Sequence, residues 1–262
     1  MKIRRLTQAL TFPAALAILL TTGTSTQAHY VYYAQQAWSN SDSSLCLWNY
    51  AETSHGSNGG GYFKGEARSQ ADVDLNPFDC ILPWERNQGD LGEFLIIYKW
   101  YVNSQGDGSW LQCEKPDDWH FNSEPATTFV LWGRAPAEPL CGAGWYGIHN
   151  IAVMRDGGVW VGKESVNWSG QHLLPDTSRV STVRGAAPAA PKWATEKGLN
   201  KMPSKVAQVG RDGKLITDRN GNQVMVDTAP PELDEKNAAA GGKRTTTTDE
   251  YGNVTETVFI DF

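Results

Sequence analysis

Aromatic and cysteine residues are confined almost entirely to one stretch of this 262-residue chain. Residues 29–175 contain ten of the eleven Trp, eight of the nine Tyr and all four Cys. A segment of about 150 residues can bury roughly 70% of the surface that it exposes when unfolded, which suffices for a core. Residues 176–262 hold one Trp and one Tyr among Ala-Pro-rich and Thr-rich stretches, which is too little apolar surface to offset their ordering entropy alone. The composition therefore predicts one folded, aromatic-rich domain followed by a largely disordered, low-complexity tail.

The first residues have the three parts of a secretory signal peptide. Basic side chains within 2–5 precede an apolar run at 12–20, and small residues Thr26 and Ala28 stand where a signal peptidase cuts. The apolar run is far shorter than the roughly 20 residues of a membrane-spanning helix. We therefore expect a signal peptide over 1–28, no transmembrane segment, and a secreted, extracellular protein.

Four cysteines follow the predicted cleavage site, at Cys46, Cys80, Cys113 and Cys141. An even number of cysteines in an exported chain predicts disulfides, here two. Three pairings are possible, and we favour Cys46 with Cys80 and Cys113 with Cys141 because each bond then joins neighbouring segments. A zinc site is disfavoured because no Cys or His pair has CxxC or HxxxH spacing. We expect no metal and no cofactor.

Apolar residues within 29–175 recur in short runs of strand length, separated by clusters of Gly, Pro, Asn and Asp. This pattern is typical of β structure, and no segment shows a sustained helical period. The predicted strands are 30–35, 45–53, 62–73, 94–103, 110–113, 127–132, 146–154 and 159–163. The fold class that follows is all-β, a disulfide-containing antiparallel sandwich or small barrel.

Two of these elements carry sharper expectations. The run 94–101 is apolar at nearly every position, which is typical of a strand covered on both faces and predicts a central position. The turn 155–158, Arg-Asp-Gly-Gly, supplies the positive φ angles of a tight hairpin between the last two strands. In the tail, 215–227 and 248–261 are weaker strand-turn-strand signals that share Asp, two residues, then Gly-Asn. Isolated hairpins are marginal in water, so we expect these to be transient unless they pack on something.

Charge separates the same two regions. Residues 29–175 carry eight Lys or Arg against seventeen Asp or Glu, a net charge of minus nine, and the tail carries twelve of each sign. An acidic domain repels phosphate backbones and anionic headgroups, so nucleic acid and anionic membrane are poor candidate partners.

Ten tryptophans are more than one core of this size needs, and we expect the excess to be partly exposed. Trp84, Trp119, Trp145 and Trp168 have polar, Gly or Pro neighbours and are our candidates for ligand-binding residues. Flat indole faces suit sugar rings and flexible peptides. The competing interpretation is that the indoles fill a glycine-rich core that has few Leu and Val.

Two patterns leave a catalytic function open. Asp117 and Asp118 could include one of the paired carboxylates of a glycosidase, although a solvated acidic loop is the simpler interpretation. His29, if it becomes the first residue of the mature chain, could chelate copper together with His120 or His149, as in secreted oxidative enzymes that cleave polysaccharides.

Three pieces of sequence resemble a group of small secreted Gly/Trp-rich β-domain proteins of actinobacteria. They are GGGYFKGE at 59–66, CGAGWYGIH at 141–149 and WSGQHLLP at 168–175. The resemblance covers 44–175 and not the tail. That group has no assigned activity, so the resemblance implies secretion and a compact β domain and adds no catalytic residue.

Two functions remain open. The first is a secreted, non-catalytic binding or surface-interaction protein that contacts an extracellular glycan or protein through exposed Trp and Tyr. The second is a secreted glycan-active enzyme, either a hydrolase or a copper enzyme with an N-terminal histidine. Because no complete catalytic motif is present, the sequence favours the first.

Overall fold

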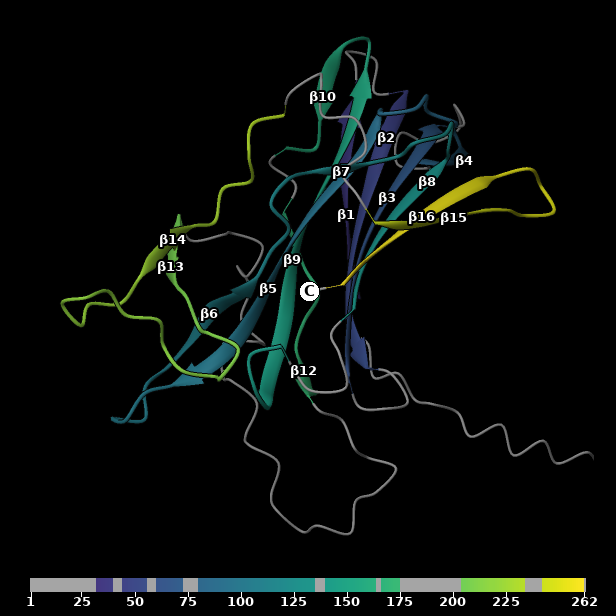
Figure 1. Ribbon diagram of the computed structural model, residues 1–262. Coiled ribbons are helices and arrows are strands. Elements are labelled where there is room, and N and C mark those ends of the chain that lie inside the picture. Colours follow the sequence, from purple (N-terminus) through teal and green to yellow (C-terminus); the bar gives the residue numbers. More distant parts are fainter. Residues whose placement is uncertain are drawn as a thin grey trace, which may run out of the picture.

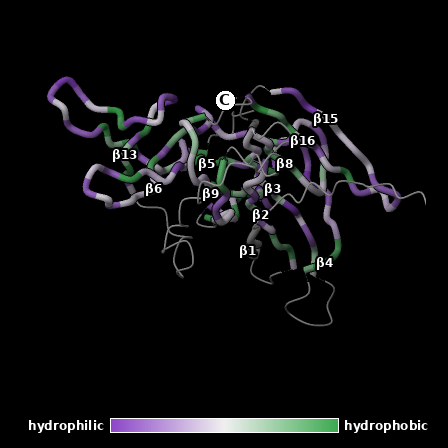
Figure 2. Tube along the Cα trace, turned by 90° about the horizontal axis from the view of Figure 1, so that it is seen from below, coloured by the Kyte–Doolittle hydropathy of each residue, from purple (hydrophilic) through white to green (hydrophobic). Residues whose placement is uncertain are grey.

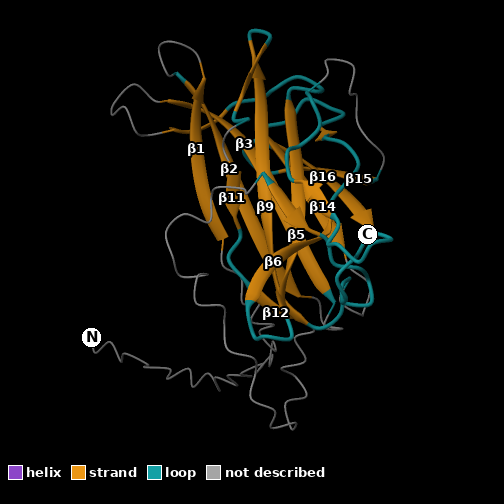
Figure 3. Cartoon of the chain, turned by 90° about the vertical axis from the view of Figure 1, so that its left-hand side faces the viewer, coloured by secondary structure: helices purple, strands orange, loops and turns teal. Residues whose placement is uncertain are grey.

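The computed structural model describes residues 32–39, 44–55, 60–72, 80–134, 140–163, 166–174, 204–233 and 242–261. In these ranges every regular element is a strand and none is a helix (Figure 3). The described part therefore contains no helix that could cross a membrane. The predicted signal peptide over 1–28 and His29 lie outside the described residues.

Two open sheets face each other, which makes the fold a sandwich rather than a barrel (Figure 1). The first sheet contains, in spatial order, β1 (Tyr32–Ser39), β2 (Leu45–His55), β3 (Gly61–Asp72), β8 (Thr128–Arg134), β16 (Val254–Asp261) and β15 (Lys243–Thr248), with β4 (Cys80–Pro83) paired to β3. All its neighbours are antiparallel except β8 and β16, which run parallel.

The second sheet is built around two long strands. In spatial order it contains β10 (Val159–Val161), β9 (Gly144–Asp156), β5 (Leu91–Val102) and β6 (Gly108–Glu114); β11 (Val166–Trp168) and β12 (His172–Leu174) also pair with β9, and β7 (His120–Phe121) pairs with β5. A separate two-stranded sheet joins β13 (Lys205–Ala207) to β14 (Met225–Asp227). The predicted hairpin is confirmed, since Gly157 and Gly158 connect β9 to β10 with φ of 57° and 85°.

The prediction of a central strand in the run 94–101 is also confirmed. β5 lies between β9 and β6, and its first nine residues are buried. Side chains alternate between the two faces of a strand, so β5 contributes to two separate cores. Leu95 and Ile97 face the first sheet and join the inter-sheet core, whereas Phe94 and Ile96 join a second cluster on the outer face.

Both disulfides have the pairing that we favoured. Cys46 bonds to Cys80 and Cys113 to Cys141, with Cα atoms 6.3 Å and 6.0 Å apart. The first bond joins β2 to β4, and the second joins β6 to the segment just before β9. Disulfides persist in oxidising compartments, so these bonds indicate an extracellular or otherwise oxidising environment.

Two described parts of the predicted tail contact the sandwich. Residues 242–261 form the β15–β16 hairpin, and seven residues of β16 pair with β8. Residues 204–233 lie against the second sheet, where Val206 joins the outer cluster and Val209 the inter-sheet core. A few apolar residues of the tail thus complete cores that other segments supply. The rest of 176–262 lies outside the described residues.

Two identical turns underlie the hairpin signals of the tail. The Asp218 carboxylate accepts hydrogen bonds from the backbone N–H and the side chain of Asn222, at 2.9 Å and 3.2 Å. Asp249 accepts the same pair from Asn253, at 2.9 Å and 2.8 Å. The expectation that these hairpins need a packing partner agrees with the structure, in which both lie against the sandwich.

Shortening Val258 to Ala tests whether the C-terminal hairpin belongs to the cooperative unit. Val258 is fully buried in the inter-sheet core, so we expect a loss of about 2 kcal/mol in the free energy of unfolding. Chemical denaturation followed by tryptophan fluorescence measures it. Val159→Ala is the matched control, because Val159 is 66% exposed and the change should stay within about 0.5 kcal/mol. Equal stability of the two variants would show that the hairpin unfolds independently.

Candidate binding groove

A groove crosses the outer face of the first sheet and has a volume of about 420 Å³. We call it the outer-face groove. Its lining residues are Lys64, Glu66, Arg68, Ser69 and Gln70 of β3, Pro83 of β4, Thr127, Thr128, Val130 and Trp132 in and before β8, and Asp249, Asn253, Thr255 and Thr257 of the C-terminal hairpin. Most of these side chains are polar, and four strands and two connections contribute them.

The strand register explains why these residues meet. Residues directly opposite each other on neighbouring strands share a face. Glu66 of β3 lies opposite Val130 of β8, which in turn lies opposite Thr257 of β16. Arg68, Thr128 and Thr255 form the next row. The groove therefore runs across strands that are distant in sequence.

A charged ladder on β3 forms the floor. Lys64, Glu66 and Arg68 alternate with inward-facing residues, so all three point to the outer face. Lys64 Nζ lies 2.6 Å from Glu66 Oε2, and Arg68 forms an ion pair with the other carboxylate oxygen. The Arg68 guanidinium also lies over the ring of Tyr50, 4.7 Å from its centroid. These contacts hold donors and acceptors in fixed positions.

Aromatic rings border the ladder on both sides. On one side Trp132 contacts Tyr62 edge-on and stacks on Phe259, with both centroid distances 5.9 Å. On the other side the rings of Trp48 and Tyr50 lie 6.2 Å apart. The face thus combines apolar ring surfaces with charged and hydroxyl groups.

An exposed apolar segment extends the groove at the β4 end, where the tube is coloured hydrophobic (Figure 2). Ile81, Leu82 and Trp84 are 62%, 48% and 49% exposed. The backbone N–H of Trp84 donates a hydrogen bond to the carbonyl of Ser69, a residue that lines the groove, at 2.9 Å. Trp84 is thus an exposed ring next in sequence to Pro83, which lines the groove.

The four tryptophans predicted as ligand contacts fall into different environments. Trp84 is exposed, as expected, and Trp145 is partly buried. The expected exposure of Trp119 and Trp168 is wrong, since they are 1% and 3% exposed. The tail accounts for part of this, because the Trp119 indole N–H donates to the Pro231 carbonyl at 2.8 Å. Their polar neighbours in sequence gave no sign of this cover.

Trp119, Trp145 and Trp168 belong to the outer cluster of the second sheet together with Trp100, Trp110 and Trp160. Trp168 packs against Tyr98, Trp110 and His149, with centroid distances of 6.1, 5.2 and 5.0 Å. The interpretation that indoles fill a core therefore accounts for this face. It does not account for the aromatic border of the outer-face groove.

The groove residues Lys64, Arg68 and Trp132 were not among the sequence candidates. One signal was available: within the predicted strand 62–73, every second residue from 62 to 70 is large and polar or aromatic. That alternation marks an outward face, but it does not identify which strands lie beside it.

The structure describes Asp117, Asp118, His120 and His149 of the catalytic hypothesis, whereas His29 lies outside the described residues. Asp117 is exposed, and the Asp118 carboxylate accepts the backbone N–H of Trp119 at 2.8 Å. His120 and His149 are each 5% exposed. Among the described residues, no group of three or more His, Cys, Asp or Glu could hold a metal ion.

One buried carboxyl group has a strongly altered acidity. Glu93 of β5 is fully buried, and burial raises its pKa well above 4.5 despite hydrogen bonds from the Asn150 side chain and the Leu131 backbone N–H, at 3.1 Å and 2.8 Å. It lies between the sheets, behind the groove rather than in it, since Leu131 is an inward residue of β8. Glu93 is therefore a structural group.

Comparison with known proteins gives no match for this chain. No family model matches it, and no curated protein or solved structure is significantly similar. The resemblance to small secreted proteins of actinobacteria stays a prediction.

Replacing Glu93 by Gln should remove one pH dependence of stability. The pKa of this carboxyl group is about 4.5 in the unfolded chain and higher in the folded protein. Below about pH 4.5 the group is protonated in both states, so its burial does not reduce stability. As pH rises towards the folded pKa, the unfolded state loses its proton first, and stability falls by up to about 1.4 kcal/mol per pH unit. We therefore expect the difference in free energy of unfolding, wild type minus Glu93→Gln, to decrease from pH 4.5 to 8 in denaturation at several pH values. A difference that is constant with pH contradicts the assignment.

Proposed function

We propose that the protein is a secreted, non-catalytic binding protein that holds an extracellular glycan in the outer-face groove. The observation that carries the proposal is the charged ladder Lys64–Glu66–Arg68 between two aromatic borders on one open sheet face. The disulfides agree with an oxidising compartment, and the signal-peptide pattern of 1–28 supports export.

The chemistry of this face favours a glycan over an apolar ligand. Sugars offer many hydroxyl groups that both donate and accept hydrogen bonds, together with apolar C–H faces that pack on aromatic rings. The groove has paired donors and an acceptor in the ladder, threonine hydroxyls on β8 and β16, and the indole of Trp132. Its volume lies within the range of roughly 300–1,000 Å³ typical of ligand sites.

The ladder is better suited to binding than to catalysis. A glycosidase acid must hold or release a proton on a free carboxyl oxygen. Lys64 engages one oxygen of Glu66 and Arg68 the other. Glu66 is only 4% exposed and orients Lys64 and Arg68, whose more exposed side chains can donate hydrogen bonds to sugar hydroxyls.

Substitutions at the groove and at its β4 end should weaken glycan binding without unfolding the domain. Arg68→Met removes a donor of the ladder, and Trp84→Ala removes the exposed ring at the β4 end. We expect each to weaken binding at least ten-fold, since losing a charged hydrogen bond or an aromatic contact removes about 1.5 kcal/mol or more. Binding is measured by co-sedimentation with chitin, peptidoglycan and xylan, and by tryptophan fluorescence titration with soluble fragments of each.

Tyr251→Ala is the control for the loss of an exposed aromatic ring. Tyr251 is 82% exposed at the tip of the C-terminal hairpin and does not line the groove, so its removal should leave affinity unchanged. If the wild-type protein binds none of the three polysaccharides, the glycan proposal is wrong. If a polysaccharide binds equally well to wild type and Arg68→Met, the binding lies elsewhere.

A further inference from the structure

The C-terminal hairpin forms one wall of the outer-face groove. Asp249 and Asn253 in its turn and Thr255 and Thr257 on β16 line the groove, opposite the β3 ladder. Hydrogen bonds from the side chain and backbone of Asn253 lower the pKa of Asp249 below 3.8, so this wall carries a negative charge at neutral pH. Without the docked hairpin, the groove loses this side entirely.

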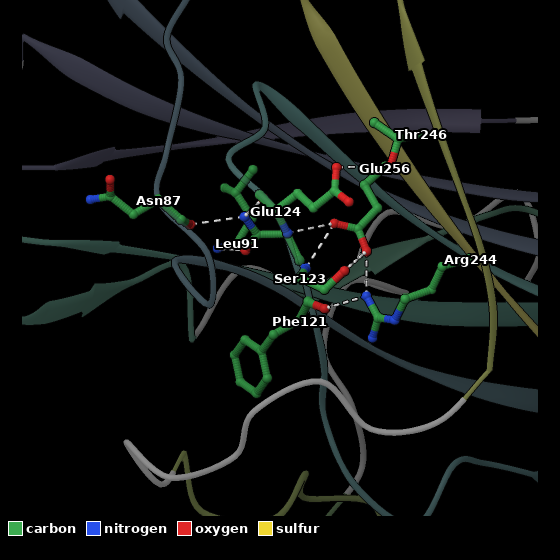
Figure 4. Close-up of polar contacts among 9 residues, drawn as sticks. Asn87, Leu91, Phe121, Ser123, Glu124, Arg244, Thr246 and Glu256 are labelled. Atoms are coloured by element: carbon green, nitrogen blue, oxygen red, sulfur yellow. Dashed lines mark hydrogen bonds and ion pairs between the residues drawn. The ribbon is translucent and has the colours of Figure 1, made fainter.

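The hairpin docks through a buried carboxylate rather than through hydrophobic contacts alone. Glu256 is fully buried and inserts its carboxylate into the loop that follows β7 (Figure 4). One oxygen accepts the backbone N–H groups of Ser123 and Glu124, at 2.7 Å and 3.1 Å. The other accepts the Ser123 hydroxyl at 2.7 Å and pairs with Arg244.

These hydrogen bonds keep the buried group charged. Burial alone would raise the pKa of Glu256, but the bonds from Ser123, Arg244 and Glu124 outweigh it and lower the pKa below 4.5. Arg244 also donates to the Phe121 carbonyl at 2.9 Å, which ties β15 to the same loop. We call this set of contacts the Glu256 clasp. It connects the hairpin to residues 121–124, away from the groove lining.

We propose that the Glu256 clasp controls the outer-face groove, so that docking of the C-terminal hairpin and binding of a glycan stabilise each other. This inference rests on the proposed function. The physical reason is linkage: a ligand that contacts both β3 and the hairpin binds the docked form more tightly, and it must therefore favour docking by the same factor. The clasp residues act as positioning residues, because none of them lines the groove.

Glu256→Gln tests the clasp with almost no change in shape. An amide places an N–H donor either against the backbone N–H groups of Ser123 and Glu124 or against Arg244, so one side of the clasp becomes repulsive. Hydrogen exchange of residues 243–261 and 128–134, followed by mass spectrometry, reports docking, since β16 pairs with β8. Affinity is measured with chitohexaose, soluble peptidoglycan fragments and xylohexaose.

For Glu256→Gln we expect faster hydrogen exchange in residues 243–261 and at least ten-fold weaker binding of the probe that the wild-type protein binds. In the wild-type protein, we expect that probe to slow the hydrogen exchange of residues 243–261. Glu250→Gln is the matched control, because Glu250 is exposed in the turn of the same hairpin and does not line the groove. It should change neither exchange nor affinity. Ser123→Ala is the milder second variant should Glu256→Gln unfold, which would show as fast exchange in the central strand 91–102.

The outcomes separate the two proposals. Faster exchange of the hairpin with unchanged affinity overturns the coupling and leaves glycan binding intact. Unchanged exchange in both Glu256→Gln and Ser123→Ala shows that the clasp does not hold the hairpin and also overturns the inference. If wild type binds none of the probes and none slows its hairpin exchange, the proposed function and the coupling fall together.

Discussion

The two-sided burial of β5 is the constraint on which the rest of the structure depends. A strand that is apolar on both faces needs a cover on each side. The first sheet covers one face, and the loop around Trp119 together with residues 204–233 of the tail covers part of the other. Among the described residues, the second sheet therefore contributes to both hydrophobic clusters, and the first sheet contributes to the inter-sheet core. The first sheet has only its inner face to bury, and its outer face stays available for a ligand.

A polar network fixes how the two sheets face each other. Asn49 of β2 and Asn150 of β9 bond reciprocally at 3.0 Å, and Asn150 also donates to Glu93. Asn167 donates to the Asn49 carbonyl at 2.8 Å. Gly65 makes room for this network, since a Cβ there would lie 2.3 Å from the Asn150 side chain. Buried amides with specific partners disfavour any other register, because a shift of one residue would leave them unsatisfied.

The sequence predicted those structural features that depend on residues close to one another along the chain. Strand positions, the 157–158 hairpin, the double burial of 94–101 and the disulfide pairing all follow from local periodicity, turn chemistry or chain proximity. The prediction that Trp119 and Trp168 are exposed was wrong because the segments that bury them are distant in sequence. The groove was missed for the same reason, since β3, β8 and β16 become neighbours only through non-consecutive pairing.

The parallel pairing of β16 with β8 gives the C-terminal hairpin an unusual position in this architecture. All other neighbouring strands in the first sheet run antiparallel. β15, which lies beyond β16, is exposed along most of its length, so the hairpin is supported by β8 on one side. Elements with few buried contacts open at lower free energy than the core. Val258 and the Glu256 clasp supply the buried contacts that the rest of the hairpin lacks. A groove built half on a rigid sheet and half on such an element is one whose ligand can stabilise the structure that binds it.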